Sequence, residues 1–592
     1  MPARKTRIEL SEAAPALVLG AAIVALVALD VWWLHRFRFG FVTEWDESGY
    51  ISIALQNSHA LSSGGLFSLI STVIDQGVQA PLVPLGAVPF NVVFGEGVDS
   101  SLLVEPAFFA LLALSTYGVA RRLVDPWWAV LAALSVATAP MVTDYTRIFH
   151  FSVPAAAMFT SALWALLRSE GLSRRGWAVG CGLLLGLMVL ARSMTIAFLP
   201  GFGLAAVLPL ALSPVDRRRR AFNFVLLCAG GGALAALWYA PNLFSVGDYL
   251  LHFGYGAESS AYGAAHSPIS VGYWTREAGG LIDEIYLPLA AVLAACLLAA
   301  ATSFALRGDR PRPSWEVLRT WLAGSTGLTL VVVVEGYVAL TSSRNQGTAF
   351  ALPWLPALVV LVFAAVASIR QRRLRLVLAA CLAAVALFDV TMKSGLVPEV
   401  ASPATADLPV LGQTTIADGR GIVEAEVEDS GYPTNGPTEP MPELQREWLP
   451  FAERLARWSY AYAERHVGEP FLASGFDDPL LSNTRIALGS ELALSRQLPT
   501  LFLKPFPHGD SAASYRAQLQ ETHANLLVTG QRGPGTPGIV LTRSRVEAAA
   551  RSLGFQPVRR FVLPDGRTLT MWWRSMGDAA PAGSAAGADS GT

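Results

Sequence analysis

The chain has few charged residues for its length. Only 15% of its 592 residues are Asp, Glu, Lys or Arg, whereas a soluble domain carries about 25%. Hydrophobic residues make up 53% of the sequence, and the mean hydropathy is +0.43. The net charge of −1 gives no basic surface for nucleic acid. This composition, with its long apolar runs, indicates a protein that crosses a membrane several times.

Cysteine is also scarce, and every cysteine lies inside an apolar run: Cys181, Cys228, Cys296 and Cys381. The sequence contains no CxxC and no HExxH motif. These cysteines are therefore predicted to be small core residues, not disulfides or zinc ligands. No small-x-small cleavage site follows the first apolar run, so residues 13–34 are predicted to form a retained transmembrane helix and not a signal peptide.

Apolar segments long enough to cross a bilayer recur along two thirds of the chain and predict about eleven transmembrane helices. They lie at 13–34, 102–120, 127–143, 153–167, 176–191, 195–213, 221–240, 285–306, 317–340, 349–369 and 374–393. The expected fold is an all-α polytopic membrane domain over residues 1–393.

Clusters of arginine and lysine predict the orientation of these helices. If the helices alternate, the clusters fall on one side: Arg4, Lys5 and Arg7; Arg121 and Arg122; Arg174 and Arg175; Arg217 to Arg220; Arg307, Arg310 and Arg312; and Arg370, Arg372, Arg373 and Arg375. The positive-inside rule makes this side cytoplasmic. The N-terminus is then cytoplasmic, and everything after the last helix is periplasmic or extracellular. The expected location is a bacterial inner (plasma) membrane.

Two of the predicted outer loops are long, and the chain changes character after the last apolar run. The loops are residues 35–101 and 241–284. Residues 80–95, rich in proline, are predicted to lie along the membrane interface. The remaining segments are an acidic, Pro- and Gly-rich linker (394–442), a small outer α/β domain (443–576) and a disordered tail (577–592).

The α/β assignment of the C-terminal region comes from periodicity and one turn signal. An amphipathic helix is expected at 443–467 and a second helix at 544–553. Short apolar runs predict strands at 471–474, 525–529 and 538–542. Pro564-Asp-Gly566 lies between two β-prone runs and predicts a hairpin.

The first outer loop contains the residues best suited to chemistry. Glu44-Trp-Asp-Glu-Ser-Gly-Tyr50 places three carboxylates beside two aromatic residues just after the first helix. A carboxylate near the membrane surface is partly desolvated, which raises its basicity. A general base must lie within about 3 Å of the hydroxyl it deprotonates. The same pattern also fits a solvated acidic loop without a catalytic role.

Several further stretches occur in a characteristic order. They are Gln79-Ala-Pro-Leu-Val-Pro-Leu, Ala120-Arg-Arg-Leu-Val-Asp-Pro-Trp-Trp-Ala, Ala139-Pro-Met-Val-Thr-Asp-Tyr-Thr-Arg147, Gly182-Leu-Leu-Leu-Gly-Leu-Met-Val-Leu-Ala-Arg192 and Phe350-Ala-Leu-Pro-Trp-Leu-Pro356. Together with Asp46, Glu47 and Tyr50, this order resembles the GT-C superfamily of membrane glycosyltransferases over roughly residues 15–390. The resemblance is to protein O-mannosyltransferases and lipid A aminoarabinose transferases, glycosyltransferase families 39 and 83.

The sequence departs from this family at two places. Many relatives carry an acidic residue shortly after the arginine of the second outer loop, whereas here Arg147 is followed by Ile-Phe-His-Phe-Ser-Val-Pro154. Arg192 replaces the usual lysine. Which sugar is transferred, and to which acceptor molecule, therefore does not follow from the resemblance.

The resemblance implies a role for each matching residue. Asp46 would be the general base, and Glu47 would orient the acceptor or hold a divalent cation; no cofactor is certain. The implied donor is a polyprenyl-phosphate sugar, and the acceptor is a hydroxyl of a glycan, lipid or protein. The residues expected to bind substrate are Tyr50, Gln79, Arg147, Arg192, Tyr255, Glu258, His266 and Arg344.

The evidence behind these binding residues differs. Arginines suit phosphate because their guanidinium is a fixed fork of donors, but they also snorkel at interfaces; Arg276 is a further candidate. Tyr255, Glu258 and His266 belong to a loop that could close as a lid over the site. Asp283 and Glu284 could form a second acidic site, but the preferred prediction is a solvated helix start.

Two other classes of function stay open. A lipid or solute transporter would often show internal repeats, and no convincing repeat is present. A catalytically silent scaffold whose C-terminal domain binds cell-envelope glycan is disfavoured, without being excluded, by the intact Asp46-Glu47 pair. The Trp572-Trp573 pair could stack on sugar, although such pairs are more often core residues.

Overall fold

The computed structural model describes most of the chain and divides it into two compact units. The described residues are 3–38, 40–42, 45–213, 215–254, 256, 267–306, 314–343, 349–408, 412–466, 468–476, 478–504, 509–534 and 541–575. The first unit, here called the membrane unit, comprises Met1–Trp32, Val78–Val83 and Glu105–Gly419. The second, here called the mixed unit, comprises Trp33–Gly77, Pro84–Val104 and Arg420–Thr592. Most of the first outer loop thus groups with the C-terminal region.

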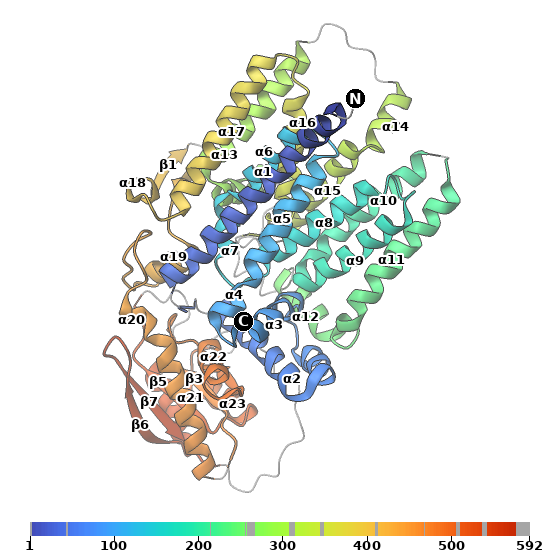
Figure 1. Ribbon diagram of the computed structural model, residues 1–592. Coiled ribbons are helices and arrows are strands. Elements are labelled where there is room, and N and C mark those ends of the chain that lie inside the picture. Colours follow the sequence, from blue (N-terminus) through green and yellow to red (C-terminus); the bar gives the residue numbers. More distant parts are fainter. Residues whose placement is uncertain are drawn as a thin grey trace. The chain divides into compact units, whose positions relative to one another are not determined.

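The membrane unit is almost entirely helical (Figure 1). Its elements are α1 (Ala3–Trp33), α5 (Val104–Ala120), α6 (Pro126–Ala137), α7 (Pro140–Thr146), α8 (Ser152–Arg168), α9 (Arg175–Ala191), η2 (Ser193–Phe198), α10 (Leu199–Leu212), α11 (Arg217–Tyr239), α12 (Leu243–Gly254), α13 (Val271–Ala305), α14 (Trp315–Leu322), α15 (Ser325–Ser342), α16 (Leu355–Ala367), α17 (Arg372–Lys393), α18 (Pro398–Ala401), β1 (Ala404–Leu408) and β2 (Gly412–Ala417). Each of the eleven predicted apolar segments contains helix. The predicted helical membrane fold is confirmed.

Fewer helices are long and apolar enough to cross a membrane than the eleven apolar segments predicted. In the described part of the chain, seven helices are long and apolar enough to cross a membrane. Helices α6 and α7 form an eighth candidate that is bent by 61°. The bend has a local cause, because Pro140 begins α7 and proline cannot continue the preceding helix. The Asp125 side chain caps the start of α6 by accepting hydrogen bonds from two backbone N–H groups.

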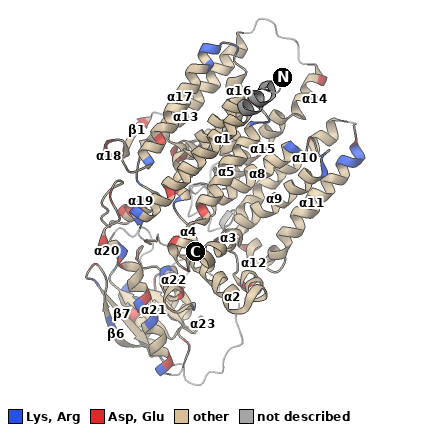
Figure 2. Ribbon diagram, in the orientation of Figure 1, with Lys and Arg blue, Asp and Glu red and all other residues tan. Residues whose placement is uncertain are grey.

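The charged residues of the membrane unit gather at helix ends (Figure 2). One basic group lies where α10 meets α11, and another begins α17. Residues 217–219 and 370–373 are exposed. This is the distribution that bilayer-crossing helices require, because a charged side chain at the bilayer centre is costly.

Helices α9 and α11 lie side by side (Figure 1) and meet through glycine. A Cβ atom on Gly182 would collide with the carbonyl oxygen of Leu227, and one on Gly186 would lie 2.8 Å from that of Gly231. Gly180, on the same helix, has open space in that direction. Small residues allow membrane helices to approach this closely, and the helices then gain van der Waals packing.

We expect Gly182→Ala to destabilise the membrane unit by about 1–3 kcal/mol, because overpacking forces the two backbones apart. Gly180→Ala is the matched control and should leave stability unchanged or slightly raised. The measurement is the thermal unfolding midpoint of the detergent-purified protein. Equal midpoints for the two variants would contradict the close α9–α11 contact.

The mixed unit combines helices with one five-stranded sheet. Its elements are η1 (Leu34–Arg38), α2 (Trp45–Asp75), α3 (Leu82–Phe94), α4 (Val98–Leu102), α19 (Ile422–Asp429), α20 (Glu443–Arg446), α21 (Trp448–Arg465), β3 (Leu472–Gly475), α22 (Asn483–Leu494), β4 (Thr500–Phe502), α23 (Ala512–Glu521), β5 (Leu526–Gly530), α24 (Arg543–Ser552), β6 (Gln556–Val562) and β7 (Thr568–Trp573). The strand order is β4-β3-β5-β7-β6. β3 is parallel to β4 and β5, and β7 is antiparallel to β5 and β6. The predicted small α/β domain is confirmed.

Local predictions in the C-terminal region can be compared with these elements. The helices at 443–467 and 544–553, the first two strands and the hairpin at Pro564–Gly566 are present. Residues 538–540 of the third predicted strand, and the tail 577–592, lie outside the described residues. The segment 394–442 has more regular structure than its Pro and Gly content predicted: it contains α18, the antiparallel β1–β2 pair and α19. Both Trp572 and Trp573 are buried in the sheet.

Candidate functional site

Asp46 lies in the first turn of α2 and its side chain is exposed. The N-terminus of a helix carries partial positive charge, which stabilises a carboxylate there. Tyr50 lies four residues further along the same helix and is half-buried. Residues four apart share a helix face, so Asp46 and Tyr50 point to the same side of α2.

Glu47 is buried and forms a two-pronged ion pair with Arg38. The Arg38 guanidinium donates from Nη1 to Oε1 at 2.8 Å and from Nη2 to Oε2 at 2.6 Å. Its Nε also donates to the carbonyl oxygen of Phe41 at 3.0 Å. Both oxygens of Glu47 are therefore engaged by a cation from its own unit. This arrangement fits a buried structural ion pair and does not fit a metal ligand.

The part of the chain that the structure describes adds no metal cluster to this carboxylate. Within the described ranges, no group of three or more His, Cys, Asp or Glu side chains is placed to hold a metal ion.

The first half of α2 is also held by the C-terminal region, through α22. His59 of α2 lies between two carboxylates, with Nε2 2.5 Å from Glu96 and Nδ1 3.4 Å from Glu491 of α22. Burial raises the pKa of Glu491 to about 7, and the nearby Glu96 adds to the rise, while a hydrogen bond from Gln56 opposes it.

We expect the stability of the wild-type protein to fall as pH rises through about 7. A raised carboxyl pKa means that the folded state holds the proton more tightly than the unfolded state. The contribution of Glu491 to the free energy of unfolding is therefore complete below about pH 4.5 and is lost as Glu491 ionises in the folded protein. The contribution is at most about 3 kcal/mol. Thermal unfolding midpoints between pH 5 and 9 should fall less steeply for Glu491→Gln than for the wild type. Parallel profiles would contradict the assignment.

Arg147 is buried inside the membrane unit and bound to groups far away in sequence. Its Nε donates to Asp30 of α1 at 2.9 Å, and its Nη1 donates to the carbonyl oxygen of Lys393 at 2.6 Å. Lys393 in turn donates to Asp144 at 2.7 Å and to the Tyr286 hydroxyl at 3.0 Å. Arg147 thus belongs to an ion network that joins α1, α7, α13 and α17.

Sequence reasoning did not predict this network. Three of its members, Asp30, Asp144 and Lys393, are charged residues that follow apolar stretches near the ends of α1, α7 and α17. Such residues are costly in a membrane unless paired, so their presence was itself a signal of mutual contact. Which of these residues pairs with which could not be predicted without the fold.

Arg192 is buried between two aromatic rings. Its guanidinium carbon lies 3.9 Å from the ring centre of Phe350 and 4.5 Å from that of Phe151. Its Nη1 donates to the carbonyl oxygen of Ala349 at 3.2 Å. Burial, and then the charge of Arg192, lower the pKa of His150 well below its ordinary value, so this ring is neutral near pH 7.

Glu284 reaches the same backbone position from another helix. It accepts a hydrogen bond from the Ala349 N–H at 2.7 Å. The prediction that Asp283 and Glu284 form a solvated helix start is wrong, because both lie inside α13, which begins at Val271, and Glu284 is buried. Arg192 and Glu284 together fix the backbone that follows the predicted phosphate-binding residue Arg344.

The other predicted binding residues are only partly covered. Gln79 is half-buried and lies in the segment Val78–Val83 of the membrane unit. Arg276 donates to the carbonyl oxygen of Ser343 at 2.8 Å. Four predicted binding residues, three of them in the expected lid, lie outside the described residues: Tyr255, Glu258, His266 and Arg344.

Comparison with known proteins identifies the architecture. Residues 78–244 match the family described as dolichyl-phosphate-mannose-protein mannosyltransferase. The structure is similar to ArnT from Cupriavidus metallidurans bound to undecaprenyl phosphate, with a TM-score of 0.50, 16% identity, and coverage of 94% of this chain and 98% of that chain. The protein has a GT-C-like fold.

A second GT-C structure is similar over much of the chain. The archaeal oligosaccharyltransferase AglB from Archaeoglobus fulgidus, in complex with an inhibitory peptide and a dolichol-phosphate, has a TM-score of 0.50 and 12% identity. The match covers 86% of this chain and 69% of AglB. None of the curated protein sequences matches the chain. The resemblance to GT-C transferases is confirmed, while identities this low establish the fold alone.

Proposed function

We propose that the protein is a membrane glycosyltransferase that moves a sugar from a polyprenyl-phosphate donor to an acceptor hydroxyl on the outer face of a bacterial inner membrane. The observation that carries the proposal is the environment of the acidic pair. Asp46 is exposed at the start of α2, whereas Glu47 is buried and neutralised by Arg38. One carboxylate is therefore placed to meet a substrate, and the other fixes the turn before it. The GT-C fold and the lipid phosphates bound by ArnT and AglB support the choice of donor.

In this mechanism Asp46 is the general base. It takes the proton of the acceptor hydroxyl while that oxygen attacks the anomeric carbon of the donor sugar. The bond from the anomeric carbon to the phosphate oxygen breaks, and the lipid phosphate leaves with the electron pair. Because a phosphate is a good leaving group, a nearby cation is sufficient to stabilise its charge and no strong general acid is required.

We infer that Arg192 binds the donor phosphate, with Arg276 and Arg344 as further candidates. Stacking between Phe151 and Phe350 fixes the plane of the Arg192 guanidinium, which suits a planar fork of donors. Arg147 fits a structural role better, since Asp30 and the carbonyl oxygen of Lys393 engage it.

The test is sugar transfer in membranes that contain the overexpressed protein. Several radiolabelled polyprenyl-phosphate sugars are supplied separately, and label is followed into envelope glycan, lipid and protein fractions. The proposal expects transfer from at least one donor, with none in membranes that lack the protein. If no donor supports transfer while the purified protein moves the lipid donor across liposome bilayers, the protein is a transporter.

The proposed orientation has a separate test. Single cysteines are placed near the N-terminus and at Asp75, in a variant without the four natural cysteines. A membrane-impermeant maleimide should label position 75 in intact spheroplasts and should label the N-terminal site only after lysis. The reverse pattern would place the acidic loop in the cytoplasm and refute the proposal.

A further inference from the structure

The segment that leads into α2 is bound by the C-terminal part of the mixed unit. The backbone N–H of Met441 donates to the carbonyl oxygen of Phe37 at 3.0 Å. A Cβ atom on Gly49 would lie 3.8 Å from the Thr484 side chain, so α2 and α22 are in contact near their first turns. The start of α2, which carries Asp46, thus contacts residues more than 400 positions later in the chain.

Arg485 is the centre of this contact. It lies on α22 and is 1% exposed. Its Nη1 donates to the carbonyl oxygen of Leu480 at 2.6 Å, and its Nη2 donates to the carbonyl oxygen of Val42. The guanidinium carbon also lies 5.3 Å from the centre of the Phe41 ring. One side chain therefore joins its own domain to the backbone four residues before Asp46.

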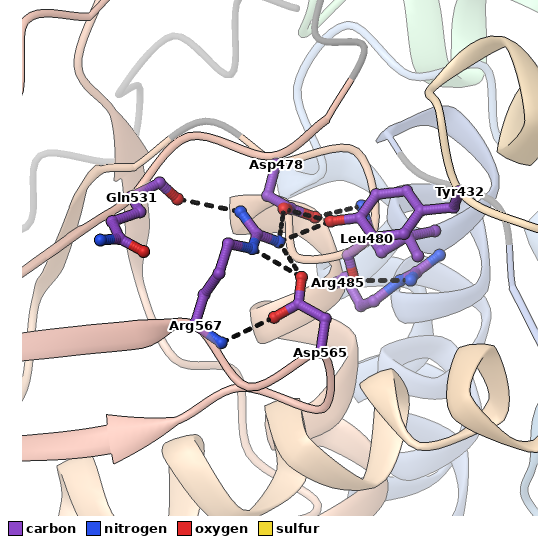
Figure 3. Close-up of polar contacts among 7 residues, drawn as sticks. All are labelled: Tyr432, Asp478, Leu480, Arg485, Gln531, Asp565 and Arg567. Atoms are coloured by element: carbon purple, nitrogen blue, oxygen red, sulfur yellow. Dashed lines mark hydrogen bonds and ion pairs between the residues drawn. The ribbon is translucent and has the colours of Figure 1, made fainter.

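On the domain side, Arg485 lies next to a network of polar contacts (Figure 3). The Leu480 N–H donates to Asp478 Oδ1 at 2.8 Å, which fixes the turn before α22. Asp478 also accepts a hydrogen bond from the Tyr432 hydroxyl at 2.6 Å and pairs with Arg567. The guanidinium of Arg567 is held in turn by Asp565 in the β6–β7 turn. Arg485 therefore connects the turn that this ionic network holds to the segment before Asp46.

Arginine is the side chain that this geometry requires. Its planar fork places two donors at fixed angles, and its flat face stacks on an aromatic ring at the same time. Lysine offers one compact charge and cannot reproduce both hydrogen bonds and the stacking. Removing the guanidinium would leave two buried carbonyl oxygens without their donors, so the segment has a physical reason to shift.

We propose that Arg485 is a positioning residue: it holds the Phe41–Val42 backbone in place and thereby sets the position of Asp46 for sugar transfer. The inference rests on the proposed function of Asp46. The Arg38–Glu47 pair holds the residue that follows Asp46, and Arg485 holds the backbone at Val42, which precedes Asp46. On this proposal, the C-terminal domain holds the Phe41–Val42 segment and thereby the start of α2, which carries Asp46.

The test compares Arg485→Met, Arg485→Lys and the matched control Arg457→Met, whose parent side chain is exposed on α21. We expect Arg485→Met to lower kcat roughly ten- to hundredfold with the donor KM within about twofold, because small displacements of a reacting group have effects of this size. Arg485→Lys should recover part of kcat, and Arg457→Met should match the wild type. An unchanged kcat in Arg485→Met would refute the inference.

A second readout does not depend on activity. Amide hydrogen exchange of the purified full-length protein should become faster in peptides that cover residues 37–50 in Arg485→Met, but not in peptides from β5 or β7. If amide hydrogen exchange in residues 37–50 is unchanged in Arg485→Met, Arg485 does not hold this segment, whatever the catalytic result. If no donor supports transfer by the wild type, the proposed function fails, and this exchange measurement still tests the contact.

Arg485→Met could unfold the domain, which would be seen as faster amide hydrogen exchange in β5 and β7. A variant of Phe41, on the other side of the contact, tests the inference in that case. Phe41→Ala removes the stacking partner and leaves the Asp478 network intact. We expect the same loss of kcat and the same local increase in exchange from Phe41→Ala. A Phe41→Ala protein with wild-type kcat would refute the inference.

Discussion

Asp46→Asn is expected to lower sugar transfer by about a hundred- to ten-thousandfold, the range that a general base contributes. Asparagine keeps the size of the side chain but cannot accept the hydroxyl proton. Because Asp46 is exposed in the first turn of α2 and asparagine has nearly the same size and shape, the replacement should leave folding intact. The measurement is initial transfer rate, normalised to the amount of purified protein, with an active polyprenyl-phosphate sugar donor.

Asp75→Asn is the matched control, since Asp75 is an exposed carboxylate at the other end of the same helix. It should transfer sugar at the wild-type rate. Both variants should elute as the wild type does on size exclusion and unfold at the same temperature. An Asp46→Asn protein that keeps more than about a tenth of the wild-type rate would exclude Asp46 as the base, because even the weakest such base contributes about a hundredfold.

Breaking the Arg38–Glu47 pair should have the largest effect on stability. Glu47→Gln leaves the buried Arg38 guanidinium without its counter-charge, which costs about 3–5 kcal/mol. We expect a clear drop in the thermal unfolding midpoint and in the amount of protein that accumulates in membranes. The double variant Arg38→Met/Glu47→Met should recover most of the midpoint, because no unpaired charge remains buried.

The exposed pair Arg496–Glu469 provides the comparison for this effect. Glu469→Gln should cost less than about 1 kcal/mol, since surface ion pairs contribute little. A Glu47→Gln protein as stable as Glu469→Gln would show that the Arg38–Glu47 pair does not hold the turn before α2. A double variant less stable than Glu47→Gln alone would show that packing, and not charge, dominates at this position.

Hydropathy predicted the membrane helices because lipid imposes a simple rule that acts on each segment separately. A run of apolar residues must satisfy its own backbone hydrogen bonds, and a helix does so without any partner. All eleven apolar segments contain helix for this reason. The bend between α6 and α7 could also be predicted locally, since Pro140 stands at the break.

The candidate site was only partly predictable. The acidic cluster of the first outer loop was visible because three carboxylates lie close together, a short distance after the first apolar run. The resemblance gave Asp46 and Glu47 separate roles at the site, but only the fold showed that Glu47 is buried against Arg38 while Asp46 is exposed. In the same way, Arg147 was predicted to bind phosphate, but its partner Asp30 lies 117 residues earlier in the chain.

The sequence by itself determined the membrane class, the helical segments, the α/β nature of the C-terminal domain and the resemblance to GT-C transferases. These properties depend on local composition, periodicity and short motifs, which act within a few turns of the chain. The tertiary structure alone decided which charges neutralise one another, and it grouped most of the first outer loop with the C-terminal domain. The physical reason is that ion pairing and burial depend on distance in space, and residues such as Val42 and Arg485 become neighbours only when the chain is folded.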